Sequence, residues 1–213
     1  MRIHFDDVDA TEVDRRIALY GPLTQAVREL IDATIRTEVD DETIRDVEAT
    51  VRAATARLRE KQVDGSLGVT VTTDGTMLDW GNAAVGVRNP IAPPLVAEMD
   101  ETGLCWSELE LGAAYEGPPG LVHGGILALL VDQILGIAVA SGSKPSFTGT
   151  LTLQYRKATP LGKVRLEARV ERVEGLKTFV AGSVSTTEGR TVEANAIFIH
   201  PSWARDLPQQ SAS

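Results

Sequence analysis

The chain has 213 residues and a mass of 22.8 kDa, which is enough for one medium-sized domain or one domain with a substantial extension. Hydrophobic residues make up 43% of it, which excludes disordered and collagen-like chains. Its 21 basic and 30 acidic residues give a net charge of −9. This charge argues against sequence-independent binding of nucleic acid, because such binding depends on Lys and Arg that neutralise phosphates.

The few cysteine and histidine residues exclude two kinds of structural cross-link. A single cysteine, Cys105, cannot form an intramolecular disulfide and fits a reducing compartment. His4, His123 and His200 are scattered along the chain, so we expect no metal site. The first ten residues are acidic where a signal peptide would be basic and then apolar, so we expect a soluble cytoplasmic protein.

Residues 10–62 are predicted to be helical throughout, because apolar residues recur there at i, i+3 and i+4. Gly21-Pro22 is expected to separate a short first helix from the next one. The acidic run from Asp40 to Glu42 is typical of a further helix start. We interpret residues 1–62 as an N-terminal helical extension that packs against the main domain or a second subunit.

From Val63 onward the pattern is that of strands, and it predicts a second domain over residues 63–203, with a C-terminal tail at 204–213. Residues 79–96 contain three prolines and two glycines and are expected to be extended and irregular. Asp74-Gly75 is a turn signal. The predicted strands cover residues 67–73, 104–111, 148–156, 164–174, 177–186 and 191–200.

Between the two sets of strands, residues 123–140 (HGGILALLVDQILGIAVA) predict one long helix. Asp132 and Gln133 at its centre, together with three glycines, argue against a membrane span. A surface helix shows a polar residue in every turn, whereas this one is apolar nearly all round and is expected to be buried nearly all round. A buried helix followed by an antiparallel sheet predicts an α+β fold in which the sheet wraps around the helix.

Asp132 is the first candidate for chemistry. A carboxylate in a buried apolar helix must be paired, protonated or functional, because an unpaired charge is costly to desolvate. The alternative interpretations are a structural ion pair or a stripe that faces solvent.

The helix start supplies the second set of candidates. The first-turn N–H groups of a helix are unsatisfied and lie at its positive end, so those of Gly124 and Gly125 could receive a developing oxyanion. A tight turn into the helix would explain the glycines equally well. His123 could orient this loop or a substrate carbonyl, or it could be a plain hydrogen-bonded cap.

Residues 141–213 hold ten basic and six acidic residues and could therefore meet an anionic small molecule. Arg156 and Lys157 end a predicted strand, and such a pair suits phosphates. The alternative is that both cations are simply solvated. Thr148 begins the first strand after the helix, and a hydroxyl at that place is ordinary on its own.

Residues 115–125 (YEGPPGLVHGG), with Asp132 nine positions after His123, resemble the hotdog-fold acyl-CoA thioesterases. Within that superfamily the chain is most similar to the PaaI-like group, in the branch that contains the carboxyl-terminal modulator protein thioesterases. Simpler bacterial PaaI-like enzymes carry an Asn six residues before the His, where this chain has Gly117. The similarity covers about residues 64–200 and continues through 148–157, 159–161 and 173–177.

The resemblance implies a hotdog fold, in which a curved antiparallel sheet encloses a long helix and two subunits pair their sheets, with active sites at the interface. A homodimer or homotetramer is therefore implied. The resemblance also implies that Asp132 is the general base or nucleophile and that Gly124 or Gly125 is an oxyanion donor. His123 would hold the loop before the helix, and Thr148 would position water or the carboxylate.

The spacing along the helix bears on how such a site is assembled. Asp132 lies roughly 13 Å along the helix from His123, so it cannot serve a carbonyl held at its own helix start. A site shared between subunits, with Asp132 supplied by the facing subunit, predicts an obligate dimer.

We therefore expect an acyl-CoA thioesterase of fatty acid metabolism. It would hydrolyse medium- or long-chain acyl-CoA to free acid and coenzyme A without metal or organic cofactor, with Arg156 and Lys157 near the coenzyme A phosphates. The main alternative is a non-catalytic acyl-CoA-binding or regulatory protein on the same fold. A hydratase acting on enoyl-CoA is disfavoured, because nine residues separate His123 from Asp132.

Overall fold

The computed structural model describes residues 3–5, 8–73, 77–140 and 146–201. The predicted turn at Asp74-Gly75 and the predicted tail at 204–213 lie outside the described residues. The chain forms two compact units, Met1–Ile91 and Ala92–Ser213. The first unit therefore extends past the predicted helical extension, because strands within residues 69–78 pair with one near the N-terminus.

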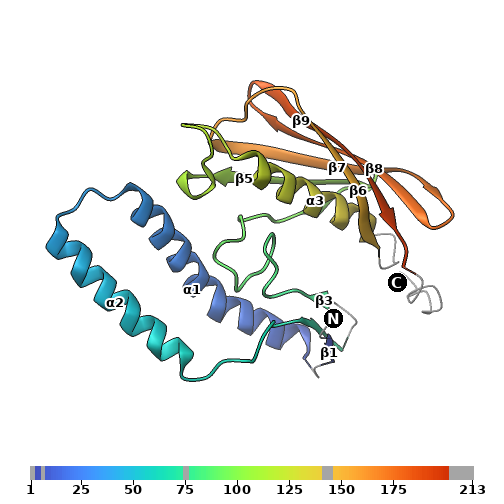
Figure 1. The fold of residues 1–213 in the computed structure, drawn as a ribbon. Helices are drawn as coiled ribbons and strands as arrows, with labels where there is room; N and C mark the ends of the chain where they lie inside the picture. Colours follow the sequence, from blue (N-terminus) through green and yellow to red (C-terminus); the bar gives the residue numbers. More distant parts are fainter. Residues whose placement is uncertain (1–2, 6–7, 74–76, 141–145, 202–213) are drawn as a thin grey trace. The chain divides into compact units, whose positions relative to one another are not determined.

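The first unit consists of two helices and a small sheet (Figure 1). The three-stranded sheet has the order β1-β2-β3, with β1 parallel to β2 and β2 antiparallel to β3. The carboxylates of Asp9 and Asp40 cap the two helices by accepting from the N–H groups three residues later. The elements are β1 (Ile3–Phe5), α1 (Ala10–Arg36), α2 (Asp41–Arg59), β2 (Val69–Val71) and β3 (Met77–Leu78).

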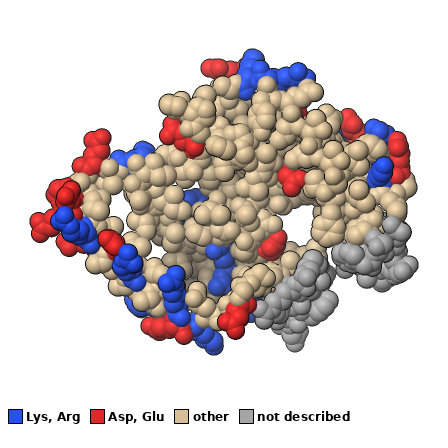
Figure 2. Space-filling model, in the orientation of Figure 1, with Lys and Arg blue, Asp and Glu red and all other residues tan. Residues whose placement is uncertain are grey.

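The predicted break at Gly21-Pro22 is wrong, because α1 continues through Pro22. The proline ring holds φ near a helical value, and its missing N–H costs the helix one backbone hydrogen bond. Charged side chains one turn apart pair along both helices, as in Glu12–Arg16 and Glu48–Arg52. Figure 2 accordingly shows acidic and basic side chains interspersed along these helices.

The second unit contains one long helix and a six-stranded sheet of order β4-β5-β7-β8-β9-β6, in which all neighbours are antiparallel. The predicted helix and the predicted strands of this unit are confirmed to within two residues at each end. The elements are β4 (Glu98–Met99), β5 (Leu104–Leu111), the 3₁₀ turn η1 (Ala113–Tyr115), α3 (Gly124–Ala140), β6 (Phe147–Tyr155), β7 (Gly162–Glu174), β8 (Lys177–Thr186) and β9 (Gly189–Ile199).

Helix α3 lies against the curved sheet and contacts β5, β6, β7, β8 and β9 (Figure 1). The approach is close: a Cβ added at Gly182 on β8 would lie 2.9 Å from Cδ2 of Leu135. Each large apolar side chain buried in this core stabilises the fold by about 2 kcal/mol. The buried residues of α3 are Leu127, Leu130, Val131, Ile134, Leu135, Ala138 and Val139. The predicted α+β fold with a sheet wrapped around a helix is confirmed.

Strand β6 is hydrogen-bonded to β9 along one edge only, and most of its residues are exposed. Residues 79–96 are irregular, as predicted, and the side chains of Asn82 and Asn89 bond the local backbone in place of a regular element. Across the described part of the chain, no helix is long and apolar enough to cross a membrane.

Candidate active site

The turn before α3 is closed by its own hydrogen bonds. The N–H of His123 donates to the carbonyl of Tyr115, and that of Gly117 to the carbonyl of Leu121, each at 2.9 Å. The N–H of Gly120 donates to the Glu116 carboxylate at 2.6 Å, and a φ of 75° at Gly120 requires glycine there. The Glu-Gly-Pro-Pro-Gly segment is therefore a rigid turn that fixes where His123 stands.

His123 caps α3. Its Nδ1 accepts the N–H of Gly125 at 2.9 Å, so Nε2 is assigned the proton of the neutral ring. Its carbonyl accepts the N–H groups of Ile126 and Leu127. Among the described residues, the first-turn N–H of Gly124 has no partner. Of the two glycines singled out in the sequence, Gly124 is the one with a donor available to a ligand.

Gly117 lies so close to His123 that no side chain fits. A Cβ added there would be 2.8 Å from the Cα of His123 and 3.2 Å from its Cδ2. The histidine therefore occupies the space into which an Asn at this position would project. This chain has a tightly packed turn in place of that Asn.

Tyr155, which the sequence analysis did not single out, fixes the helix start from the other side. Its hydroxyl donates to the carbonyl of Gly124 at 2.8 Å, and its ring would contact a Cβ added there at 3.5 Å. This contact joins the last residue of β6 to the first of α3. Only its place next to Arg156, in a segment that resembles the family, could have drawn attention to it.

Asp132 is paired with a hydroxyl and not with a cation. The Oγ1 of Thr148, the second residue of β6, donates to Oδ1 of Asp132 at 2.8 Å. The structural ion pair that the sequence left open is absent among the described residues, because no salt bridge to Asp132 is present there. Asp132 is half-buried, and its second carboxylate oxygen makes no hydrogen bond or ion pair with a described residue.

Strand β6 connects the two halves of the site. Its start, at Thr148, is bonded to the middle of α3, and its end, at Tyr155, is bonded to the helix start. The strand therefore runs antiparallel to α3. Within one chain the carboxylate of Asp132 stays about 12 Å along the helix from the free N–H of Gly124, eight residues away.

The predicted phosphate-binding pair directly follows β6. Arg156 is ion-paired with Glu193 at 2.8 Å and also bonds Gln154. This guanidinium lowers the pKa of the Glu193 carboxyl, first by hydrogen bonding and then by its charge. Lys157 is exposed, and its ammonium group has no partner in the described part of the chain. The pair lies one and two residues beyond Tyr155, at the helix-start end of the site.

The chain is similar to known proteins over the residues of this site. A family model described as the thioesterase superfamily matches residues 119–193, which include the site from His123 to Arg156 and Lys157. The crystal structure of RHA08564, described as a thioesterase superfamily protein, has a TM-score of 0.75 and 30% sequence identity. The similarity covers 84% of this chain and 94% of that one.

Two curated relatives are similar over a shorter stretch. Acyl-coenzyme A thioesterase THEM4 of Xenopus laevis is 34% identical over 91 residues, which are 41% of each chain. Acyl-coenzyme A thioesterase THEM5 of Homo sapiens is 25% identical over 101 residues, which are 46% of this chain and 41% of the relative. The matches thus span about two fifths of the length of these relatives.

Proposed function

Because the chain belongs to the thioesterase superfamily, we propose that it hydrolyses an acyl-CoA thioester to a free acid and coenzyme A. One observation carries the proposal. An unpartnered helix-start N–H at Gly124 and a carboxylate held by a hydroxyl at Asp132 are presented at opposite ends of one open edge strand. The names of the curated relatives give the substrate class, acyl-coenzyme A.

The site is completed by a second copy of the chain. An open, exposed edge strand such as β6 invites pairing with another strand. A two-fold axis through the middle of β6 pairs it antiparallel with its copy, which brings the start of one strand opposite the end of the other. Thr148 and Asp132 of one subunit then lie beside the partner's counterpart of Tyr155 and Gly124. A homodimer, alone or within a tetramer, would hold two such shared sites.

The chemistry follows from these groups. Asp132 takes a proton from a water molecule whose oxygen attacks the thioester carbonyl carbon, and the Gly124 N–H donates to the resulting oxyanion. When the tetrahedral intermediate collapses, the carbon–sulfur bond breaks and the proton on Asp132 passes to the leaving thiolate. Thr148 orients the carboxylate throughout by donating to Oδ1. Direct attack by the Asp132 carboxylate, with later hydrolysis of the anhydride, uses the same residues.

The remaining groups hold the helix start in position or bind the substrate. Tyr155 and His123 hold the helix start in place, and Gly125 contributes the N–H that keeps the His123 ring oriented. Arg156 and Lys157 would meet the phosphates of coenzyme A at that end. The proposed reaction needs no metal or organic cofactor. The proposed substrates are medium- or long-chain acyl-CoA. The proposed compartment is the cytoplasm.

Replacement of Asp132 by Asn tests this proposal. Asn has nearly the same size, can still accept from Thr148, and lacks only the charge and the proton-accepting power. A positioned base contributes about 10²–10⁴-fold, so kcat should fall at least about a hundredfold while KM changes little. Thiol release is measured with acyl-CoAs of graded chain length, and the melting temperature is measured on the same preparation.

The outcomes separate the alternatives. A variant that melts early yet keeps its activity would make Asp132 a structural residue and refute the mechanism. A wild-type protein that binds acyl-CoA but releases no thiol would favour the non-catalytic binding protein, for which the absence of the Asn at Gly117 is the supporting observation.

A further inference from the structure

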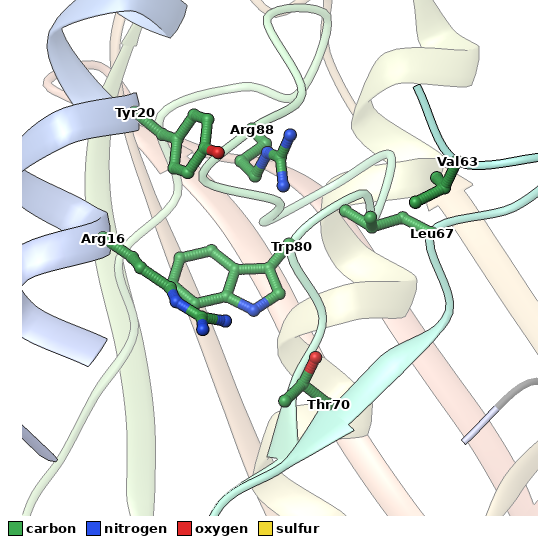
Figure 3. A pocket seen from close by; sticks show the side chains of 7 residues that line it. All are labelled: Arg16, Tyr20, Val63, Leu67, Thr70, Trp80 and Arg88. Atoms are coloured by element: carbon green, nitrogen blue, oxygen red, sulfur yellow. The ribbon is translucent and has the colours of Figure 1, made fainter. Parts of the chain in front are cut away.

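The first unit contains a pocket of about 200 Å³ that has no part in the proposed reaction. Two side chains come from α1, one from β2, and the others from the segment before β2 and the irregular segment after β3 (Figure 3). Its walls combine aromatic rings and aliphatic side chains with guanidinium groups. The lining residues are Arg16, Tyr20, Val63, Leu67, Thr70, Trp80 and Arg88.

Two largely buried residues of this pocket carry polar groups that lack partners. Thr70 is 9% exposed and Trp80 is 5% exposed. Neither the Thr70 hydroxyl nor the Trp80 indole N–H makes a hydrogen bond to another described residue. Figure 3 shows both groups facing the same space, with the Arg16 guanidinium beside the indole. Both donors open into the pocket, so a ligand that supplies an acceptor there can bond them.

The cations of the pocket point to an anionic acceptor. Arg88 is the only basic residue between residues 64 and 140, and it stacks over the Tyr20 ring at 3.9 Å. Its guanidinium forms no ion pair in the described part of the chain. Arg16 bonds Glu12 at 2.8 Å, and no acidic side chain lines the pocket itself. The stacked, unpaired guanidinium of Arg88 is thus available for an anion.

We propose that this pocket binds the carboxylate of a small organic acid with an apolar body. Two neutral donors, Thr70 and Trp80, and the guanidinium of Arg88 match a singly charged carboxylate, and the aromatic and aliphatic walls match its body. A volume of about 200 Å³ admits a short acid and excludes a nucleotide-sized ligand. The site lies in the first unit and is independent of the proposed thioesterase activity.

Isothermal titration calorimetry on the full chain tests this assignment. The ligands are sodium butanoate, hexanoate and octanoate, with hexan-1-ol and inorganic phosphate as comparisons. Affinity should increase about fourfold for each methylene that the pocket buries. The alcohol and phosphate should bind at least about tenfold more weakly than hexanoate, because each lacks either the charge or the apolar body.

Matched variants locate the binding. Arg88→Gln and Thr70→Val should each weaken hexanoate binding at least about tenfold, because each removes a donor to the carboxylate. Thr70→Ser, which keeps the hydroxyl, and Arg45→Gln, which lies on α2 outside the pocket, should bind like the wild type. Asp132→Asn should also leave this binding unchanged, which separates the pocket from the proposed active site.

Three results would overturn the proposal: no binding of any carboxylate, tightest binding of phosphate, or carboxylate binding that survives Arg88→Gln and Thr70→Val. Should Thr70→Val fail to fold, Arg88→Gln decides the matter, because the exposed Arg88 side chain has no buried partner to lose.

Discussion

At the start of α3, one ring nitrogen decides which backbone donor is left for a substrate. The sequence predicts a glycine N–H donor, but the choice between Gly124 and Gly125 depends on where the Nδ1 of His123 points. A side-chain rotamer leaves no trace in sequence spacing. The contact between Tyr155 and Gly124 spans 31 residues and was unpredictable for the same reason. The pairing of Asp132 with a hydroxyl was foreseeable only through the family resemblance.

Gly117→Asn tests the packing of this turn. The new Cβ would lie 2.8 Å from the Cα of His123, a contact with backbone that no side-chain rotation relieves. Overpacking of this kind costs about 1–3 kcal/mol, so the melting temperature should fall. Gly136→Ala in α3 is the control, because its Cβ would make only an ordinary contact of 3.7 Å with Phe198. A Gly117→Asn protein as stable as the wild type would contradict the described position of His123.

Among the elements, strands β5, β7, β8 and β9 of the second unit were the most predictable, because apolar residues recur along them and give each one a buried face. Strand β4, which has two exposed residues, was not predicted. Strand β1 was missed, since it has three residues and its partner β2 lies 66 positions further along the chain. The break at Pro22 was wrongly predicted, since the sequence does not show that one missing hydrogen bond is tolerated in a helix of 27 residues. That β6 forms an edge follows only from the strand order.

The end of β6 offers a test of coenzyme A binding. Arg156→Ala removes a cation near the proposed phosphate site, so KM for acyl-CoA should increase several-fold, with kcat nearly unchanged. Glu193→Gln leaves Arg156 charged and frees it from its ion pair, so KM should stay the same or decrease. Arg156 is exposed and Glu193 is half-buried, so neither change should cost more than about 1 kcal/mol of stability. Equal KM values in the two variants would refute the placement.

At the scale of the whole molecule, the sequence predicts a helical part and a sheet-bearing part. The structure has two compact units, and the first of them includes the strands β2 and β3. The division into units could not be read from composition, because it depends on the long-range pairing of β1 with β2. The buried core around α3 was predictable, because a helix that is apolar on every side has to be covered on every side.

Cys105 reports on the integrity of that core. The thiol is fully buried, and burial raises its pKa, so little thiolate forms at neutral pH. Native protein should therefore react with a disulfide reagent far more slowly than protein unfolded in guanidinium chloride, which should titrate one thiol per chain. The rate should increase with pH as thiolate forms. Rapid native labelling would contradict the packing of β5 under α3.

A pair of variants isolates the two halves of the proposed site. Asp132→Asn removes the base. Gly124→Pro removes the free N–H, and proline is well tolerated at the first position of a helix. In a heterodimer of the two, one shared site carries both changes, whereas the other combines an intact Asp132 with an intact Gly124 from the opposite subunit.

The most direct test of the shared site is thiol release from acyl-CoA by that heterodimer, co-expressed with two different affinity tags and purified through both. Each homodimeric variant should be nearly inactive. The heterodimer should recover about half of the wild-type kcat per dimer, since one of its two shared sites is intact. A heterodimer no more active than either variant alone would contradict the proposal that Asp132 and Gly124 act together across a dimer interface.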